Sequence, residues 1–198
     1  MKIFFTSDQH FGHANIIKYC PIRKFSSVEE MNEGLVKNFN TRVSEGDVTY
    51  HIGDFSLSLH PMQVYLPRLK GTHHLISGNH DKCHPSDKKA SKQQEFEKEY
   101  LKAGFASVQT ELSLTLDGID FLLCHFPYTG DHTAVDRFQK YRPKDEGKIL
   151  LHGHVHSLYQ VRDRCINVGV DVWDLTPVES PAIIQIAKEI LARQLEKP

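Results

Sequence analysis

The chain has 198 residues, of which 39% are hydrophobic and 25% charged, so it is long and apolar enough to build one substantial core. Its formal net charge is −1, with 24 Lys and Arg against 25 Asp and Glu. This balance does not indicate binding to nucleic acid or to an anionic membrane, although a local basic patch stays open. The start, MKIFFTSD, holds too short an apolar run for a signal peptide, and no stretch approaches the roughly 18 apolar residues of a membrane span.

The four cysteines are widely spaced and form no C-x-x-C pair. This spacing is typical of a reduced, cytoplasmic chain rather than of a disulfide framework. Because the sequence holds no repeat, low-complexity tract or linker, we expect a single domain over residues 1–198. The cysteines are Cys20, Cys83, Cys124 and Cys165.

Short apolar runs alternate with helical patterns along the chain, which favours an α/β protein. Ser27 and Glu30 form a capping box, so a helix is predicted to begin there. Asp117-Gly118 separates two apolar runs and predicts a hairpin. In chain order, we expect strands at residues 2–6, 48–52, 73–77, 112–116, 119–124, 148–151, 158–161 and 164–168, and helices from Ser27, over residues 91–103 and from Ser180.

Groups able to bind a metal follow five of the predicted strands. In α/β sheets, sites form beyond the carboxyl ends of the strands, where loops separate and side chains converge. One such strand end means little, whereas five of them indicate a shared site. The groups are Asp8 and His10; Asp54; Asn79, His80 and Asp81; His125; and His154 and His156.

The local spacing around these groups supports the same interpretation. Asp8 and His10 are two residues apart, as are His154 and His156. If the backbone stays extended there, both members of each pair project to the same side. Glycine, which permits backbone angles closed to other residues, directly precedes three of the groups, at Gly53, Gly78 and Gly153.

Together, these blocks resemble the ordered signature of the calcineurin-like metallophosphoesterases. Each block alone is weak, but five in order over residues 8–156 are specific. The stretches TSDQHFGHANII and NVGVDVW are similar to the small bacterial and phage phosphoesterases. The resemblance implies an α/β (α+β) fold in which a β-sandwich is flanked by helices in four αββα layers. The blocks are Asp8-x-His10, Gly53-Asp54, Gly78-Asn79-His80-Asp81, His125 and Gly153-His154-x-His156.

The resemblance also implies a site for two divalent metal ions, bridged by Asp54, with His80 over the substrate. The ligand set mixes carboxylate, amide and imidazole groups without a thiolate. It therefore suits transition metals better than Ca²⁺, with Mn²⁺ foremost and Fe, Zn²⁺, Ni²⁺ or Co²⁺ as alternatives. By family analogy, one ion is held by Asp8, His10 and His156, and the other by Asn79, His125 and His154.

This site predicts a metal-dependent phosphohydrolase in which a metal-bridging hydroxide attacks phosphorus in line. His80 is the expected general acid that protonates the departing oxygen. Asp81 either orients His80 or stabilises its charge, or it caps the turn that follows. Beside Asn79, two residues are candidates for substrate binding. His13 either reaches the substrate or the outer shell of a ligand or caps the next helix, and Arg23 either clamps a phosphate in bidentate fashion or makes a surface ion pair.

Some neighbours of these residues have more ordinary expected roles. Cys83 has no identified activating base, so a bystander thiol is expected. His51 lies inside a strand and is expected to be structural, whereas His152 is expected to support the outer shell of the metal ligands. Asp171 and Trp173 are placed to shape the pocket, with the core as the alternative for Trp173.

The leading prediction is a phosphodiesterase that acts on small nucleotides or similar esters. The same site would also suit phosphomonoesters, and a nuclease would need a basic track beside the metals. Protein phosphatase activity is disfavoured, because residues 53–57 lack the Asp-Arg-Gly continuation of that branch. A non-catalytic, partner-binding scaffold is disfavoured, because every expected ligand is present. The expected partner is a small phosphoester, with no membrane, and the oligomeric state is left open.

Overall fold

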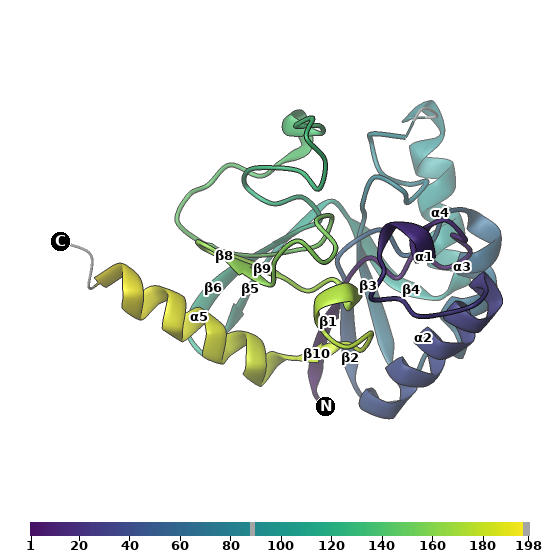
Figure 1. Ribbon diagram of the computed structural model, residues 1–198, viewed down its shortest axis with the longest axis horizontal. Helices are drawn as coiled ribbons and strands as arrows, with labels where there is room; N and C mark the ends of the chain where they lie inside the picture. The colour runs from purple at the N-terminus through teal and green to yellow at the C-terminus, as the bar shows by residue number, and fades with distance from the viewer. Residues whose placement is uncertain (88–89, 196–198) are drawn as a thin grey trace.

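The computed structural model describes residues 1–87 and 90–195. Two five-stranded mixed sheets pack face to face, with helices against them (Figure 1). The strand order is β10-β1-β2-β3-β4 in the first sheet and β5-β6-β7-β9-β8 in the second. This arrangement confirms the predicted α/β sandwich flanked by helices. The structure differs from the predicted four αββα layers in one respect, because the other face of the second sheet is covered by an irregular segment and the helix α5 (Ser180–Leu195) packs into the core between the sheets.

The strands fall close to the predicted ranges. Within the sheets, β1, β2, β3 and β4 run parallel, as do β6, β7 and β9. The carboxyl ends of parallel strands lie at one edge of a sheet, which matters for the site. The bounds are β1 Ile3–Thr6, β2 Val48–His51, β3 Thr72–Ile76, β4 Phe105–Gln109, β5 Glu111–Leu116, β6 Ile119–Cys124, β7 Ile149–His152, β8 Val161–Arg162, β9 Cys165–Asn167 and β10 Val178–Glu179.

The helices α1 to α4 gather on the side of the first sheet, and α5 lies toward the second (Figure 1). The predicted cap at Ser27 is confirmed, since the Glu30 backbone N–H donates to the Ser27 hydroxyl. The reciprocal bond of the capping box falls one residue earlier, because the Glu30 carboxylate accepts from the backbone N–H and hydroxyl of Ser26. None of the described helices is long and apolar enough to cross a membrane. The bounds are α1 Ile16–Tyr19, α2 Val28–Arg42, α3 Leu59–Tyr65, α4 Gln93–Ala103 and α5 Ser180–Leu195, with short 3₁₀ turns η1 Leu66–Arg68, η2 Ala90–Lys92, η3 Gln139–Tyr141 and η4 Val170–Val172.

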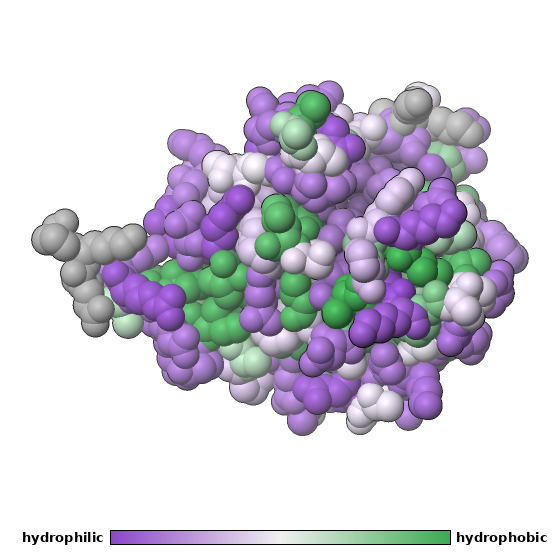
Figure 2. Space-filling view, viewed as in Figure 1, coloured by the Kyte–Doolittle hydropathy of each residue, from purple (hydrophilic) through white to green (hydrophobic). Residues whose placement is uncertain are grey.

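Strand alternation divides the apolar residues between two main cores. On β1, Phe4 packs with α2 to α4, whereas Phe5 joins the core between the two sheets. Ile183, Ala187 and Ile190 of α5 are buried in that same inter-sheet core, and apolar surface follows α5 in Figure 2. A third, smaller cluster on the second sheet is closed by an irregular segment after β6 rather than by a helix. The packing therefore leaves the strand ends, and not the sheet faces, open for a site.

One predicted strand is wrong, and three elements escaped prediction. The strand expected at residues 158–161 reduces to Val161–Arg162, because the Leu158 N–H closes a turn on the Val155 carbonyl. The strands β4 and β10 and the helix α3 were not predicted. Only the first residue of β4 is buried, β10 is two residues long, and α3 has no side-chain cap. Such short or edge elements carry too little hydrophobic periodicity to be read locally.

Candidate metal centre

The seven predicted ligands converge where five strands end. Three of these strands belong to the first sheet and two to the second, so the site lies between the sheets. Asp8 and His10 follow β1, and Asp54 follows β2. The other ligands are Asn79 after β3, His125 after β6, and His154 and His156 after β7.

Left-handed backbone, rather than extended backbone, aims most of these side chains. Five ligands have positive φ angles between 49° and 68°, so the predicted extended pairs are wrong. Asp and His enter this region more readily than most residues, at a cost of roughly 1–2 kcal/mol each. Such strain is characteristic of functional sites. The five residues are Asp8, His10, Asp54, His154 and His156.

Gly53 and Gly153 shape the site in different ways, one through its φ angle and the other through its lack of a Cβ. Gly53 has a φ of +82°, which a residue with a Cβ rarely adopts. Gly153 has no such angle, but a Cβ built on it would overlap Ser7 and the Asp8 carboxylate. Gly53 therefore supplies a backbone conformation, whereas Gly153 lets the loop after β7 approach β1.

The Asp54 carboxylate lies at the centre of the cluster. Its Oδ2 is 3.4 Å from His125 Nε2, 3.6 Å from His10 Nε2 and 4.0 Å from His80 Nε2. Its Oδ1 accepts a hydrogen bond of 2.8 Å from the His80 backbone N–H. Asp54 thus faces ligands from both sheets, as a bridging carboxylate must.

Several buried ligand atoms in this cluster have no hydrogen-bond partner. A buried polar atom normally has a hydrogen-bond partner, so several unpartnered nitrogen and oxygen atoms in one cluster are a donor set that a metal ion would satisfy. Ligand atoms of Asp8, His10 and His156 lie within 4.8 Å of one another, as do those of Asp54, His125 and His154. The unpartnered atoms are His10 Nδ1 and Nε2, Asn79 Oδ1, His125 Nε2 and His154 Nε2. The residues present therefore fit metal binding, and these two groups match most of the ligand set that the family resemblance implies.

Outer hydrogen bonds fix the orientation of two of the imidazoles. His125 Nδ1 donates to the Ile52 carbonyl at 2.8 Å, which leaves Nε2 free to face Asp54. His156 Nδ1 donates to the Asp171 carboxylate at 2.9 Å. A carboxylate behind a histidine is a common support for a metal ligand. The expected support by His152 takes another form, because His152 Nδ1 bonds the Gly153 carbonyl and not a ligand side chain.

The protonation of the ligands follows from burial and from these partners. Burial lowers the pKa of His154 to about 3, so its imidazole is neutral and able to bind a metal. For His125, burial lowers the pKa but the Asp54 carboxylate outweighs it, and the pKa rises to about 9. For His156, burial is likewise outweighed by the Asp171 hydrogen bond, and the pKa rises to about 11. The last two imidazoles therefore hold a proton that a metal must displace.

Arg23 does not serve as the predicted phosphate clamp. Its side chain is buried, and it pairs with Asp171 through Nε–Oδ1 at 2.6 Å and Nη2–Oδ2 at 3.0 Å. Its guanidinium also donates to the carbonyls of Asp8 and Gln9. The alternative of a surface ion pair is also wrong, because the pair is internal. Arg23 positions the loop after β1 and balances the charge of Asp171.

Asp81 makes neither of its two predicted contacts. Its Oδ2 accepts from the N–H groups of Gly78 and Asp54, each at 2.8 Å, and its Oδ1 accepts from that of Phe55 at 3.1 Å. Burial, together with the Asp54 carboxylate, raises the pKa of Asp81 to about 7. The carboxylate therefore ties the loop after β2 to the loop after β3, and no hydrogen bond joins it to the imidazole of His80.

His80 and His13 stand at the mouth of a cleft above the ligands. The cleft has a volume of about 570 Å³. The His80 side chain is 38% exposed there, and its ring lies 5.9 Å from that of His13. Both imidazoles thus line the cleft, and His13 Nδ1 has no hydrogen-bond partner, so it does not cap α1.

The segment after β6 contributes residues that the sequence did not single out. Asp131 Oδ2 lies 3.4 Å from His154 Nε2, and the Arg137 guanidinium donates to both Asp131 oxygens. His132 and Arg137 line the cleft. Asp131 lies six residues beyond His125, and no strand ends at it, so the strand-end pattern could not reveal it.

The remaining sequence candidates have structural surroundings. His51 is buried and bonded to His73, as expected for a structural residue. Burial raises the pKa of the Cys83 thiol, which makes it a poor nucleophile. Trp173 packs partly against the inter-sheet core, and its indole N–H donates to the Asn167 carbonyl.

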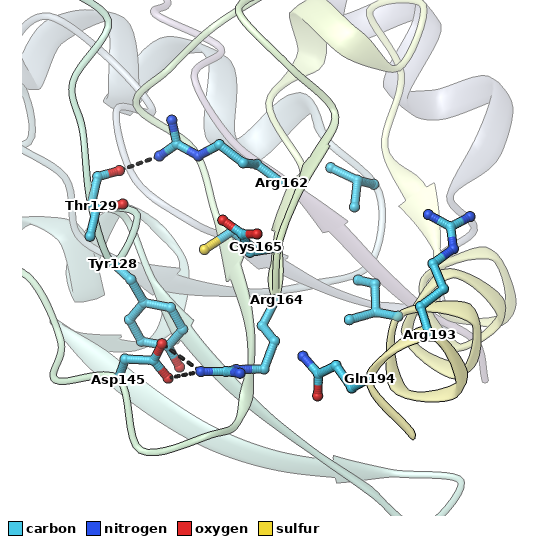
Figure 3. Close-up of a pocket in the computed structure, with 11 residues that line it drawn as sticks. Tyr128, Thr129, Asp145, Arg162, Arg164, Cys165, Arg193 and Gln194 are labelled. Carbon is cyan, nitrogen blue, oxygen red and sulfur yellow. Dashed lines mark hydrogen bonds and ion pairs between the residues drawn. The ribbon is translucent and has the colours of Figure 1, made fainter. Parts of the chain in front are cut away.

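A second cleft of about 650 Å³ lies between β8, β9 and α5 (Figure 3). Arg164 there is paired with both oxygens of Asp145, at 2.8 and 2.6 Å, and Arg162 donates to the Thr129 carbonyl. None of the described groups of metal-binding side chains lies in this cleft. Each of the described groups of metal-binding side chains instead includes a residue that lines the first cleft.

The profile of the calcineurin-like phosphoesterase superfamily domain matches residues 1–188. The Gene 66 protein of Mycobacterium phage D29 is 36% identical over 190 residues, covering 90% of this chain and 92% of its own. An uncharacterized protein of Methanocaldococcus jannaschii is 31% identical over 198 residues, covering 95% and 92%. A crystal structure from Aquifex aeolicus, titled as a protein of unknown function, superposes with a TM-score of 0.69 at 26% identity, covering 93% of this chain and 98% of that one. The chain belongs to the calcineurin-like phosphoesterase superfamily.

Proposed function

We propose that the protein is a phosphoester hydrolase that uses two divalent transition-metal ions, foremost Mn²⁺, and cleaves phosphodiesters such as small nucleotides. The observation that carries the proposal is the convergence of unpartnered ligand atoms on Asp54 from both sheets. Bound there, the metals would neutralise phosphoryl charge and lower the pKa of a shared water from about 15.7 towards about 7. The protein's own share is to hold Asp54 and the imidazoles in place.

His80 is the proposed general acid. Its backbone N–H is fixed on Asp54, and its partly exposed ring stands at the cleft mouth. From there, its imidazole would give a proton to the departing ester oxygen. His13 stands beside His80 and would contact the ester or steady the protonated ring.

A small ester fits this cleft better than a polynucleotide. Arg137 is the one Lys or Arg among the described residues that line it, and its guanidinium is already paired with Asp131. A polynucleotide would need a basic track beside the metals.

The proposal is tested by restoring metal to chelator-treated protein. With Mn²⁺ added, we expect hydrolysis of bis-p-nitrophenyl phosphate above that of p-nitrophenyl phosphate, with cyclic nucleotides and single-stranded DNA as further substrates. Absence of hydrolysis of all four with every transition metal would contradict the enzyme proposal.

A change of His80 to Asn tests the general acid. A nucleoside diester has a poor leaving group that needs a proton, so kcat for it should fall about 10²–10⁴-fold. Bis-p-nitrophenyl phosphate has a good leaving group and should lose much less. His74→Asn, at a half-buried histidine of β3 outside both clefts that His80 lines, is the matched control. Full activity of His80→Asn on the nucleoside diester would refute the assignment.

A further inference from the structure

Two exposed apolar side chains border the metal cleft. Tyr19 is 69% exposed and Leu158 is 60% exposed, and both line the cleft. A single exposed apolar residue needs no explanation. These two differ, because buried Ile16 and Val155 continue the same apolar lining inside the cleft. We call these four apolar lining residues, Ile16, Tyr19, Val155 and Leu158, the apolar wall of the cleft.

The wall reaches close to the metal ligands. The His13 ring contacts the Tyr19 ring edge-on at 6.3 Å and lies 5.3 Å from the ring of the ligand His10. Leu158 is two residues beyond His156, in a turn closed by its N–H on the Val155 carbonyl at 3.0 Å. Only the imidazole of His13 thus separates Tyr19 from the metal ligands. An ester group on a phosphate held at the ligands would therefore extend toward Tyr19.

The other exposed lining is polar. Residues 132, 133 and 137 come from the segment after β6, and the Arg137 guanidinium is held by Asp131 at 3.0 Å. A diester with one charged part and one flat apolar part could therefore place the charged part against the polar lining and the flat part against the apolar wall. A flat ring gains most on the apolar wall, because rings stack on aromatic side chains and lose water-exposed area there.

We infer that Tyr19 and Leu158 form a specificity subsite for a flat aromatic ring carried by one ester group of the substrate, as in the nucleobase of a nucleoside diester. The inference rests on the proposed phosphodiesterase function and assigns its preference to residues outside the metal ligands. Tyr19 supplies the stacking face and Leu158 the apolar contact.

Matched diesters with the same leaving group test the subsite. With Mn²⁺, methyl p-nitrophenyl phosphate is compared with phenyl p-nitrophenyl phosphate and with the p-nitrophenyl ester of thymidine 5′-phosphate. We expect kcat/KM for the ring-bearing esters to exceed that for the methyl ester by about tenfold, the scale of one stacked base. A gain with the thymidine ester assigns nucleoside substrates and a gain with the phenyl ester alone assigns aryl esters, and either supports the subsite.

The double variant Tyr19→Ala, Leu158→Ala should abolish this preference by raising KM for the ring-bearing esters, with the methyl ester within about twofold of wild type. Ile22→Ala and Val135→Ala, at exposed residues outside the cleft lining, are matched controls, and Tyr19→Phe should retain the preference. Calorimetric binding of phenylphosphonate against methylphosphonate should show the same pattern without turnover.

Equal rates for the methyl and ring-bearing esters, unchanged in the double variant, would overturn the subsite and leave the phosphodiesterase proposal standing. No hydrolysis of any ester by the wild-type protein would overturn both.

Discussion

His156 is held from behind by a buried ion pair. Its Nδ1 donates to Asp171, and the same carboxylate pairs with Arg23, which in turn donates to the carbonyl of the ligand Asp8. For Asp171, burial raises the pKa but His156 and Arg23 outweigh it and lower the pKa to about 2, so the carboxylate stays ionised. These contacts couple two ligands of one proposed metal through residues that never touch the ion.

Asp171→Asn should therefore weaken the metal at His156. An amide cannot supply the negative charge that orients and polarises the imidazole, and such supporting partners are worth about 10–100-fold in metal affinity. Competition with a chelating dye measures the loss. Asp174→Asn, at an exposed position three residues on, is the control. Unchanged affinity in Asp171→Asn would show that the contact does not support the metal.

The candidate ligands could be predicted from the sequence, but their backbone angles and supporting contacts could not. The strand-end pattern singled out all seven proposed ligands together with His80 and Asp81, and the family resemblance separated the ligands from these two. The positive φ angles of Asp8 and His156, by contrast, are set by the loops around them. The roles of Arg23 and Asp81 depend on partners 148 and 27 residues away, respectively, which no local pattern contains.

At the scale of elements, the site depends on how closely the loop after β7 approaches the end of β1. The His154 N–H donates to the Asp8 carboxylate at 3.1 Å, and the intervening space holds no room for a side chain at Gly153. Strand periodicity predicted both strands within one or two residues. The short and edge elements β4, β10 and α3 could not be predicted, because their stability comes from neighbouring elements rather than from their own pattern.

Gly153→Ala should separate these two loops. Its Cβ would overlap Ser7 and Asp8, and overpacking of this kind costs about 1–3 kcal/mol. Urea unfolding measures the free-energy change, and a metal titration should show weaker binding as well. Gly46→Ala adds a Cβ with nothing within 4 Å and no left-handed φ, so its stability should change little. Equal effects of the two substitutions would contradict the close-approach argument.

At the scale of the whole molecule, a buried chain of hydrogen bonds at the first sheet makes the stability of the fold depend on pH. Gln9 Nε2 bonds His51 Nδ1 at 3.0 Å, His51 Nε2 bonds His73 Nδ1 at 3.1 Å, and His73 Nε2 bonds the Leu69 carbonyl at 3.2 Å. This chain is satisfied only when both imidazoles are neutral. Burial lowers the pKa of His51 and of His73 below the ordinary 6.5.

The folded protein should therefore lose stability in acid. Below about pH 6.5, His51 and His73 bind protons in the unfolded chain but stay neutral when buried in the folded protein. The free energy of unfolding therefore falls by up to about 1.4 kcal/mol per pH unit for each histidine as the pH is lowered. Urea unfolding of chelator-treated protein at pH 7, 6 and 5 measures this slope. His73→Gln should reduce the slope by up to about 1.4 kcal/mol per pH unit, and His60→Gln, at an exposed histidine, is the matched control. An unchanged slope in His73→Gln would contradict the assignment.

We propose that residues of both sheets would hold two metal ions, with Asp54 among the ligands of each. Equilibrium dialysis of chelator-treated protein against Mn²⁺ tests it most directly. The predicted result is two Mn²⁺ per wild-type chain, and at most one in Asp54→Asn, since that substitution removes the bridging charge from both groups. Binding of no Mn²⁺ by the wild-type chain, or of two with equal affinity by Asp54→Asn, would contradict the account.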